Sequence, residues 1–163
     1  AWSGFQVQGP VERQGCPMTP FRTAPDTLVI HCSDTYANQD IGAAEIRQWH
    51  TKERGWDDIG YHFVIRRDGR VELGRDLRFE GAHVAGHNSH TIGICLVGGK
   101  SRAGGGEDNF QPEQYAALAG LIMGLKAVLG SVTIKGHRDF TPAKLCPVFS
   151  VPQFLSQFKI TQH

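Results

Sequence analysis

Long hydrophobic runs and an excess of charge of one sign are both missing from this sequence. The longest apolar stretch with helical period, residues 115–129, is short and carries Lys126, so we do not expect it to cross a membrane. The formal net charge over 163 residues is only +1, which gives no reason to expect a polyanionic partner. We therefore expect neither stable membrane insertion nor nucleic-acid binding.

Regularly spaced cysteines are missing too. The four cysteines are Cys16, Cys32, Cys95 and Cys146, and their spacing is not that of a disulfide framework. Cys95 alternates within an apolar run, which is typical of a buried, unreactive thiol. We favour a protein made in a reducing compartment, and a bridge from Cys16 to Cys32 or Cys146 stays open. No basic segment followed by an apolar core marks a signal peptide near Ala1.

Several motifs of well-known enzymes are absent. The sequence has no H-E-x-x-H, no G-x-S-x-G and no phosphate-binding glycine loop before a helix. The glycines of residues 98–106 are not followed by Lys-Ser/Thr, so we interpret them as a flexible connection. The composition, 40% hydrophobic and 20% charged, is typical of a folded chain with a sizeable core. We expect one domain over residues 26–163, preceded by a proline-bearing arm over residues 1–25.

Strand and helix patterns alternate along the chain, which predicts a layered α/β domain. Strands are predicted over residues 27–31, 61–65, 71–73, 91–97 and 132–135, and helices over 40–54, 112–129 and 151–158. Asp40 is expected to cap the first helix, and Asp68-Gly69 to form a hairpin turn. Gly120 and Gly124 are expected to let the long helix approach a sheet closely.

In two separated segments of the sequence, potential metal ligands stand at or after the end of an apolar run. His31 ends the strand predicted at 27–31, His137 follows the strand predicted at 132–135, and Cys146 lies in a polar loop beyond it. Two imidazoles and one thiolate with an open fourth position are the ligand set of a catalytic zinc. The spacing alone is weak support, because it lacks the C-x2-C pairs of zinc fingers. A metal-free alternative is a Cys146 nucleophile paired with His137 and oriented by Asp139.

Two further motifs lie between these ligand segments, at residues 60–69 (GYHFVIRRDG) and 81–94 (GAHVAGHNSHTIGI). Together with the ligand segments they resemble the N-acetylmuramoyl-L-alanine amidase family, which phage endolysins and peptidoglycan recognition proteins share. The resemblance covers roughly residues 27–150 in the family's order. The phrases at 45–50 and 94–99 are most similar to the phage lysozyme branch of that family.

The resemblance implies an α/β fold with a central mixed β-sheet flanked by helices. It implies cleavage of the amide bond between N-acetylmuramic acid and the L-alanine of the stem peptide in bacterial peptidoglycan, which lyses the cell. One Zn²⁺ falls on His31, His137 and Cys146, and the two polar catalytic positions fall on Tyr61 and Lys144. The segment from His137 to Lys144 is one residue longer than in the phage lysozyme branch, so its loop must absorb the difference.

Each of these positions implies a role. The metal would activate water and polarise the scissile carbonyl, while Tyr61 and Lys144 would stabilise the developing oxyanion. His83 and Asn88 match the family's substrate groove, with turn stabilisation as the alternative. Asp139 either orients His137 or caps the following turn. We expect His62 to be structural, and we expect the remaining histidines, His50, His87, His90 and His163, at the surface.

Other functions stay open beside the enzyme. Some relatives bind peptidoglycan without cutting it, and the metal-free cysteine hydrolase is a further alternative. A phage lysozyme of this type can also inhibit a phage RNA polymerase, for which residues 1–25 are the segment to examine. Without a signal peptide, an endolysin would accumulate in the host cytoplasm and act on the cell wall in the periplasm after membrane failure. We expect a monomer.

Overall fold

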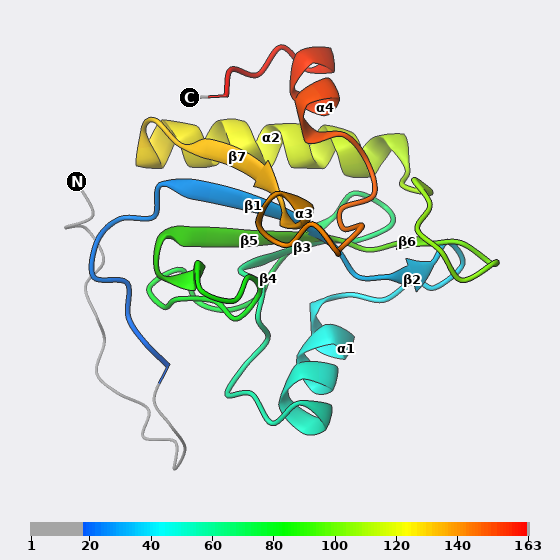
Figure 1. The fold of residues 1–163 in the computed structure, drawn as a ribbon, viewed down its shortest axis with the longest axis horizontal. Coiled ribbons are helices and arrows are strands. Elements are labelled where there is room, and N and C mark those ends of the chain that lie inside the picture. Colours follow the sequence, from blue (N-terminus) through cyan, green and yellow to red (C-terminus); the bar gives the residue numbers. More distant parts are fainter. Residues whose placement is uncertain (1–17, 163) are drawn as a thin grey trace.

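A five-stranded sheet runs through the middle of the computed structural model (Figure 1), which describes residues 18–162. The strand order is β4-β3-β5-β1-β7, and every neighbouring pair is parallel except β3 and β4. Its strands are β1 (Thr27–Cys32), β3 (Phe63–Ile65), β4 (Val71–Leu73), β5 (Thr91–Leu96) and β7 (Thr133–Gly136). A separate short pair, β2 (Thr35–Tyr36) and β6 (Gly99–Lys100), lies beyond the ends of β1 and β5.

The central strand β1 explains the continuous apolar run. It pairs with β5 on one side and β7 on the other, and all six of its residues are buried. A parallel strand covered on both faces has no solvent side and therefore no alternation of polar residues. Leu28, Val29 and Ile30 have no exposed surface at all.

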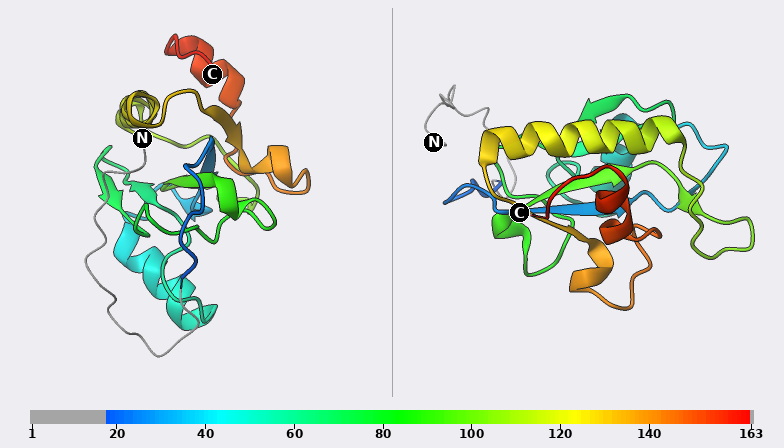
Figure 2. Two further views of the ribbon diagram at one scale, coloured as in Figure 1. Left: turned by 90° about the vertical axis from the view of Figure 1, so that its left-hand side faces the viewer. Right: turned by 90° about the horizontal axis from the view of Figure 1, so that it is seen from above.

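Helices cover both faces of the sheet (Figures 1 and 2). On one face lie α2 (Pro112–Leu129) and, beside it, α4 (Val151–Gln157), which pack onto alternate residues of β1 and β5. On the other face lies α1 (Ala43–Gln48), which continues into a π-helical turn, Trp49–Glu53. Two short elements complete the fold: a 3-10 turn before β5 (Asn88–His90) and one helical turn after β7, α3 (His137–Phe140).

The first helix begins later than predicted. Its N-cap is Gly42, and Asp40 instead makes an exposed ion pair with Arg66 at 3.4 Å. The Glu45 carboxylate accepts the Gly42 N–H at 2.8 Å, and Glu72 of β4 accepts the Ala43 N–H at 2.9 Å. The prediction of Asp40 as the cap was wrong. The Glu72 carboxylate of strand β4, and not Asp40, accepts a free N–H group of the first helical turn.

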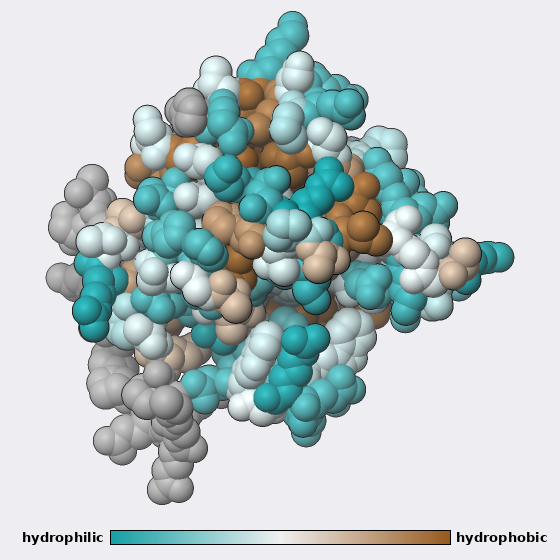
Figure 3. Space-filling view, in the orientation of Figure 1, coloured by the Kyte–Doolittle hydropathy of each residue, from teal (hydrophilic) through white to brown (hydrophobic). Residues whose placement is uncertain are grey.

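The prediction for Gly120 and Gly124 was also wrong. Both glycines face away from the sheet, and a Cβ added at either would meet nothing within 4 Å. Helix α2 packs instead through larger side chains, such as Leu118 and Ile122. In the view of Figure 3 polar residues predominate, and apolar residues gather in the upper half, around α2 and α4.

Part of the predicted arm is described. The Phe21 N–H donates to the Arg78 carbonyl oxygen at 3.0 Å, and the Phe21 ring stacks on His62 with centroids 5.8 Å apart. Residues 1–17, including Cys16, and residue 163 lie outside the described residues. The domain boundary at residue 26 and any bridge to Cys16 therefore stay predictions. In the described part, no helix is both long enough and apolar enough for a membrane span.

Candidate metal centre and active site

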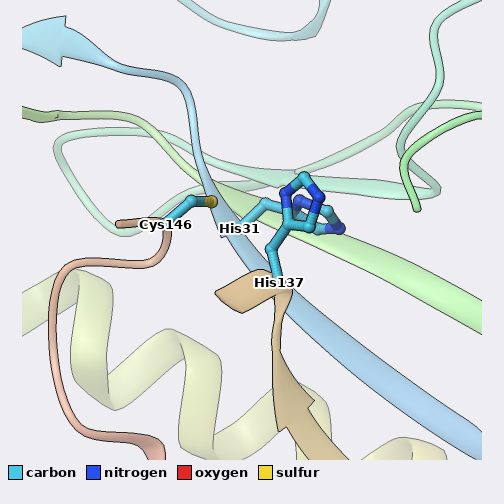
Figure 4. A group of neighbouring side chains, drawn as sticks. All are labelled: His31, His137 and Cys146. Atoms are coloured by element: carbon cyan, nitrogen blue, oxygen red, sulfur yellow. The ribbon is translucent and has the colours of Figure 1, made fainter. Parts of the chain in front are cut away.

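The structure brings His31, His137 and Cys146 together at the carboxyl-terminal edge of the sheet (Figure 4). The register pairs Ile30 of β1 with Gly136, the last residue of β7. The residue after each is a histidine, His31 in β1 and His137 at the start of α3, so the two lie side by side. Their ring centroids are 4.6 Å apart. Cys146 arrives from the loop after α3, and the ligand atoms of all three residues lie within 4.8 Å of one another.

Backbone contacts hold Cys146 in place. The Arg138 N–H donates to the Cys146 carbonyl oxygen at 3.0 Å, and the Cys32 N–H donates to the Cys146 sulfur at 2.9 Å. The hydrogen bond with the Cys32 thiol, followed by burial, raises the pKa of Cys146. An ionised Cys146 therefore needs a cation beside it, which a metal would provide.

Both histidines of the cluster are held neutral. Burial, followed by the nearby His83 and His137, lowers the pKa of His31 well below its usual value. Burial and then the charge of Lys144 lower the pKa of His137. A neutral imidazole carries the free lone pair that a metal needs, so both rings have the form that coordinates at neutral pH.

The two predicted catalytic residues lie at the same site. The half-buried Tyr61 ring is tilted against His31, with centroids 5.0 Å apart. Burial raises the pKa of Tyr61 well above its usual value, so the phenol stays protonated as a hydrogen-bond donor. Lys144 is exposed on the loop that carries Cys146, and its side chain lines the same groove.

The cluster opens into a groove of about 520 Å³. One wall follows the end of α1 and includes Trp49, His50 and Trp56, and the other includes Gly104–Gly106 and the loop at 143–148. The prediction of His50 as a surface residue was wrong, because only 8% of it is exposed. Its Nδ1 accepts the Gly60 N–H at 2.9 Å. The i+4 spacing from the buried Ile46 is the signal that could have placed it on the inner face of the helix.

His83 and Asn88 have contacts within the protein. The buried His83 lies with Nδ1 2.8 Å from His31 Nε2, and it also lines the groove. The Asn88 side-chain oxygen accepts the N–H groups of His83 and Val84 at 3.1 and 3.0 Å. These bonds of Asn88 stabilise the turn, while contact of either residue with substrate stays a prediction.

Asp139 has the capping role that was one of its two alternatives. Its carboxylate accepts the Gly136 N–H at 2.8 Å, which closes the first turn of α3. Among the hydrogen bonds and ion pairs of residues 18–162, none joins the Asp139 carboxylate to the His137 ring. The cysteine-hydrolase alternative loses the group that would have oriented His137.

The comparison with known proteins agrees with this geometry. The family model for N-acetylmuramoyl-L-alanine amidase matches residues 21–149. The endolysin of Enterobacteria phage K11 is 50% identical over 134 residues, which cover 82% of this chain and 87% of the relative. The chain belongs to the N-acetylmuramoyl-L-alanine amidase family. The endolysin of Escherichia phage T7 is 44% identical over 133 residues with the same coverage of both chains.

Solved structures share the fold of this amidase. The N-acetylmuramoyl-L-alanine amidase LysC from Clostridium intestinale superposes with a TM-score of 0.75 at 27% identity, covering 90% of this chain and 92% of LysC. Drosophila PGRP-LB gives a TM-score of 0.72 at 25% identity, covering 90% and 88%. The predicted single α/β domain with a central mixed sheet and flanking helices is confirmed.

The donor set fits the metal that this family generally uses, zinc. Within residues 18–162, one group of three potential ligand residues lies close enough together to hold a metal ion. It consists of His31, His137 and Cys146. Two neutral imidazoles and a sulfur suit Zn²⁺ better than Mg²⁺ or Ca²⁺, which prefer oxygen ligands. Three protein ligands also leave a coordination position for substrate or water.

Proposed function

We propose that this protein is a zinc-dependent endolysin that hydrolyses the amide bond between N-acetylmuramic acid and L-alanine in bacterial peptidoglycan. The observation that carries this proposal is the convergence of His31, His137 and Cys146, the last two of which line the groove. Amidase activity follows from the family, to which phage endolysins at 44–50% identity also belong. Loss of this amide bond separates stem peptides from the glycan and lyses the cell.

His31, His137 and Cys146 would hold one Zn²⁺ per chain. When bound, the ion supplies an activated water at neutral pH and a Lewis acid for the scissile carbonyl. The protein orients the substrate so that this carbonyl lies in the groove beside Tyr61. The Tyr61 phenol, kept protonated by burial, donates a hydrogen bond to the developing oxyanion. Lys144, at the rim, places a positive charge near the same oxygen.

The groove supports peptidoglycan as the substrate. Its walls combine the aromatic side chains of Trp49 and Trp56 with the charged Lys144, which suits a sugar-linked peptide better than a flat surface would. One structure of similar fold, a mutant of Drosophila PGRP-LB, was solved in complex with tracheal cytotoxin. We propose that His83 and Asn88 contribute to substrate binding. His83 lines the groove, and the Asn88 side chain accepts the backbone N–H of His83.

The place of action follows the endolysin relatives. The chain would accumulate in the host cytoplasm and reach the wall once the membrane fails. A monomer suffices, because all five groups of the proposed site come from one chain. Binding to a phage RNA polymerase stays a prediction for residues 1–25, most of which lie outside the described part.

The test combines zinc stoichiometry with digestion of purified sacculi. The wild type is expected to hold one zinc and to release stem peptides with new alanine amino groups, whereas Cys146→Ser loses both properties. Cys95→Ala is the matched control, because it removes a buried thiol outside the ligand set and should retain zinc.

Two results would overturn the proposal. A metal-free wild type that binds sacculi without cutting them would indicate a recognition module. Full activity after chelation, lost only in Cys146→Ser, would indicate a cysteine hydrolase.

A further inference from the structure

The His83 ring, which contacts His31, lies in a narrow slot between Gly81 and Gly93. A Cβ added at Gly93 of β5 would lie 2.7 Å from His83 Cγ, and one added at Gly81 would lie 2.6 Å from Cδ2. Any larger residue at either position would displace the ring. The two glycines therefore fix where the imidazole of His83 lies, and only 8% of this residue is exposed.

A chain of three hydrogen bonds runs through this slot. His31 Nε2 lies 2.8 Å from His83 Nδ1, and His83 Nε2 lies 3.3 Å from the Thr91 hydroxyl oxygen. The Thr91 hydroxyl in turn lies 2.8 Å from the carbonyl oxygen of His87. The three side chains that make these hydrogen bonds, His31, His83 and Thr91, are buried, so solvent does not compete for the bonds.

The backbone end of the chain sets the direction of every bond. The His87 carbonyl oxygen can only accept, so the single hydroxyl proton of Thr91 is committed to it. The hydroxyl oxygen must then accept from His83 Nε2–H. A neutral imidazole carries one ring proton, so His83 Nδ1 is the bare nitrogen and accepts from His31 Nε2–H.

We infer that His83 and Thr91 are positioning residues that fix the tautomer and ring orientation of His31, leaving its Nδ1 unprotonated for the metal. This inference rests on the metal site of the proposed function and adds to it the two residues that act through His31. Neither of them belongs to the group of proposed metal ligands. Such outer partners orient a ligating imidazole and raise its affinity for the ion.

Asn88 supports the position of His83 from the backbone side. Asn88 accepts the N–H groups of His83 and Val84, which anchors the backbone on which the His83 side chain is mounted. The turn at Asn88, the slot between the two glycines and the Thr91 hydroxyl thus all hold the His83 ring in place. His31, at the far end of the chain of bonds, is presented in a single form.

The test compares Thr91→Val with Thr91→Ser. Valine keeps the shape of the buried side chain but removes the hydroxyl, whereas serine keeps the hydroxyl and loses the methyl group. Two properties of the full chain are measured: zinc affinity, by competition with a chelator, and the protonation of each His31 ring nitrogen, by ¹⁵N NMR of the metal-free protein. Urea unfolding of the metal-free variants reports stability separately, and Thr91→Ala serves if the valine variant does not fold.

In the wild type and Thr91→Ser we expect His31 to carry its proton on Nε2. In Thr91→Val we expect a mixture of tautomers and zinc binding weaker by about 10- to 100-fold. An unchanged His31 tautomer with zinc affinity within about threefold of wild type in Thr91→Val would overturn the inference. Failure of the proposed function looks different, because then the wild type itself would not bind zinc.

Discussion

Tyr61 lies against the His31 ring with a phenol that burial keeps protonated. We expect Tyr61→Phe to lower turnover on sacculi by about 100- to 1,000-fold, the usual cost of losing one oxyanion donor. Zinc content should not change, because the phenol is not a ligand. Stem-peptide release and bound zinc are measured together, with Tyr36→Phe, an exposed tyrosine on β2, as the control.

Turnover of Tyr61→Phe within about threefold of wild type would remove Tyr61 from the chemistry. A parallel loss of zinc would assign it a structural role instead. Only an intact metal site with slow release agrees with a hydrogen bond made to the transition state.

The sequence motifs predicted some residues of the site but not the environments of others. His31, His137 and Cys146 could be predicted because each follows a recognisable strand or loop, and parallel strands end at one edge. The burial of His50 could have been predicted from its i+4 spacing to Ile46. The contact of His83 with His31 could not, because it joins segments 52 residues apart.

Helix α2 carries two glycines on its exposed face, where nothing lies within 4 Å of an added Cβ. We expect Gly120→Ala and Gly124→Ala each to raise the free energy of unfolding by about 1 kcal/mol, because alanine loses less backbone entropy in a helix. Urea unfolding measures the change. Gly93→Ala is the contrasting variant and should be destabilising, since its Cβ would collide with His83.

A loss of stability in both α2 variants would contradict this prediction. It would show that the outer face of the helix packs against something in solution.

Elements with continuous local patterns were predicted well, and elements set by distant partners were not. The apolar runs predicted β1 and β5, and Pro112 with the periodic leucines predicted α2. The start of α1 depends on Glu72, which is far away in the sequence. Its π-helical end, Trp49–Glu53, likewise has no local pattern that separates it from an α-helix.

The whole molecule buries histidines that must stay neutral, and this makes its stability depend on pH. Nδ1 of His62 accepts the Gly93 N–H at 3.0 Å, and burial lowers the pKa of His62 to about 4. Burial also lowers the pKa of His50 to about 4. The unfolded chain binds protons at these sites near pH 6.5, where the folded protein does not.

Stability from these two histidines is therefore complete above about pH 6.5 and is lost as the pH falls toward 4. Each contributes at most about 1.4 kcal/mol of unfolding free energy per pH unit in that interval. Urea unfolding at pH 7.5, 6 and 5 measures the slope, and His62→Gln should reduce it. A free energy of unfolding that stays constant or rises on acidification would contradict the prediction.

The proposed ligands lie far apart along the chain. Strand β7, which directly precedes His137, is an edge strand that pairs only with β1 among the described strands. During synthesis, a chain that has left the ribosome only as far as Leu129 therefore contains His31 but neither of its partners. The proposed ligand set can form only after synthesis has passed Cys146. A product that stops between Leu129 and Cys146 would carry most of the fold but an incomplete metal site, so such fragments would be inactive.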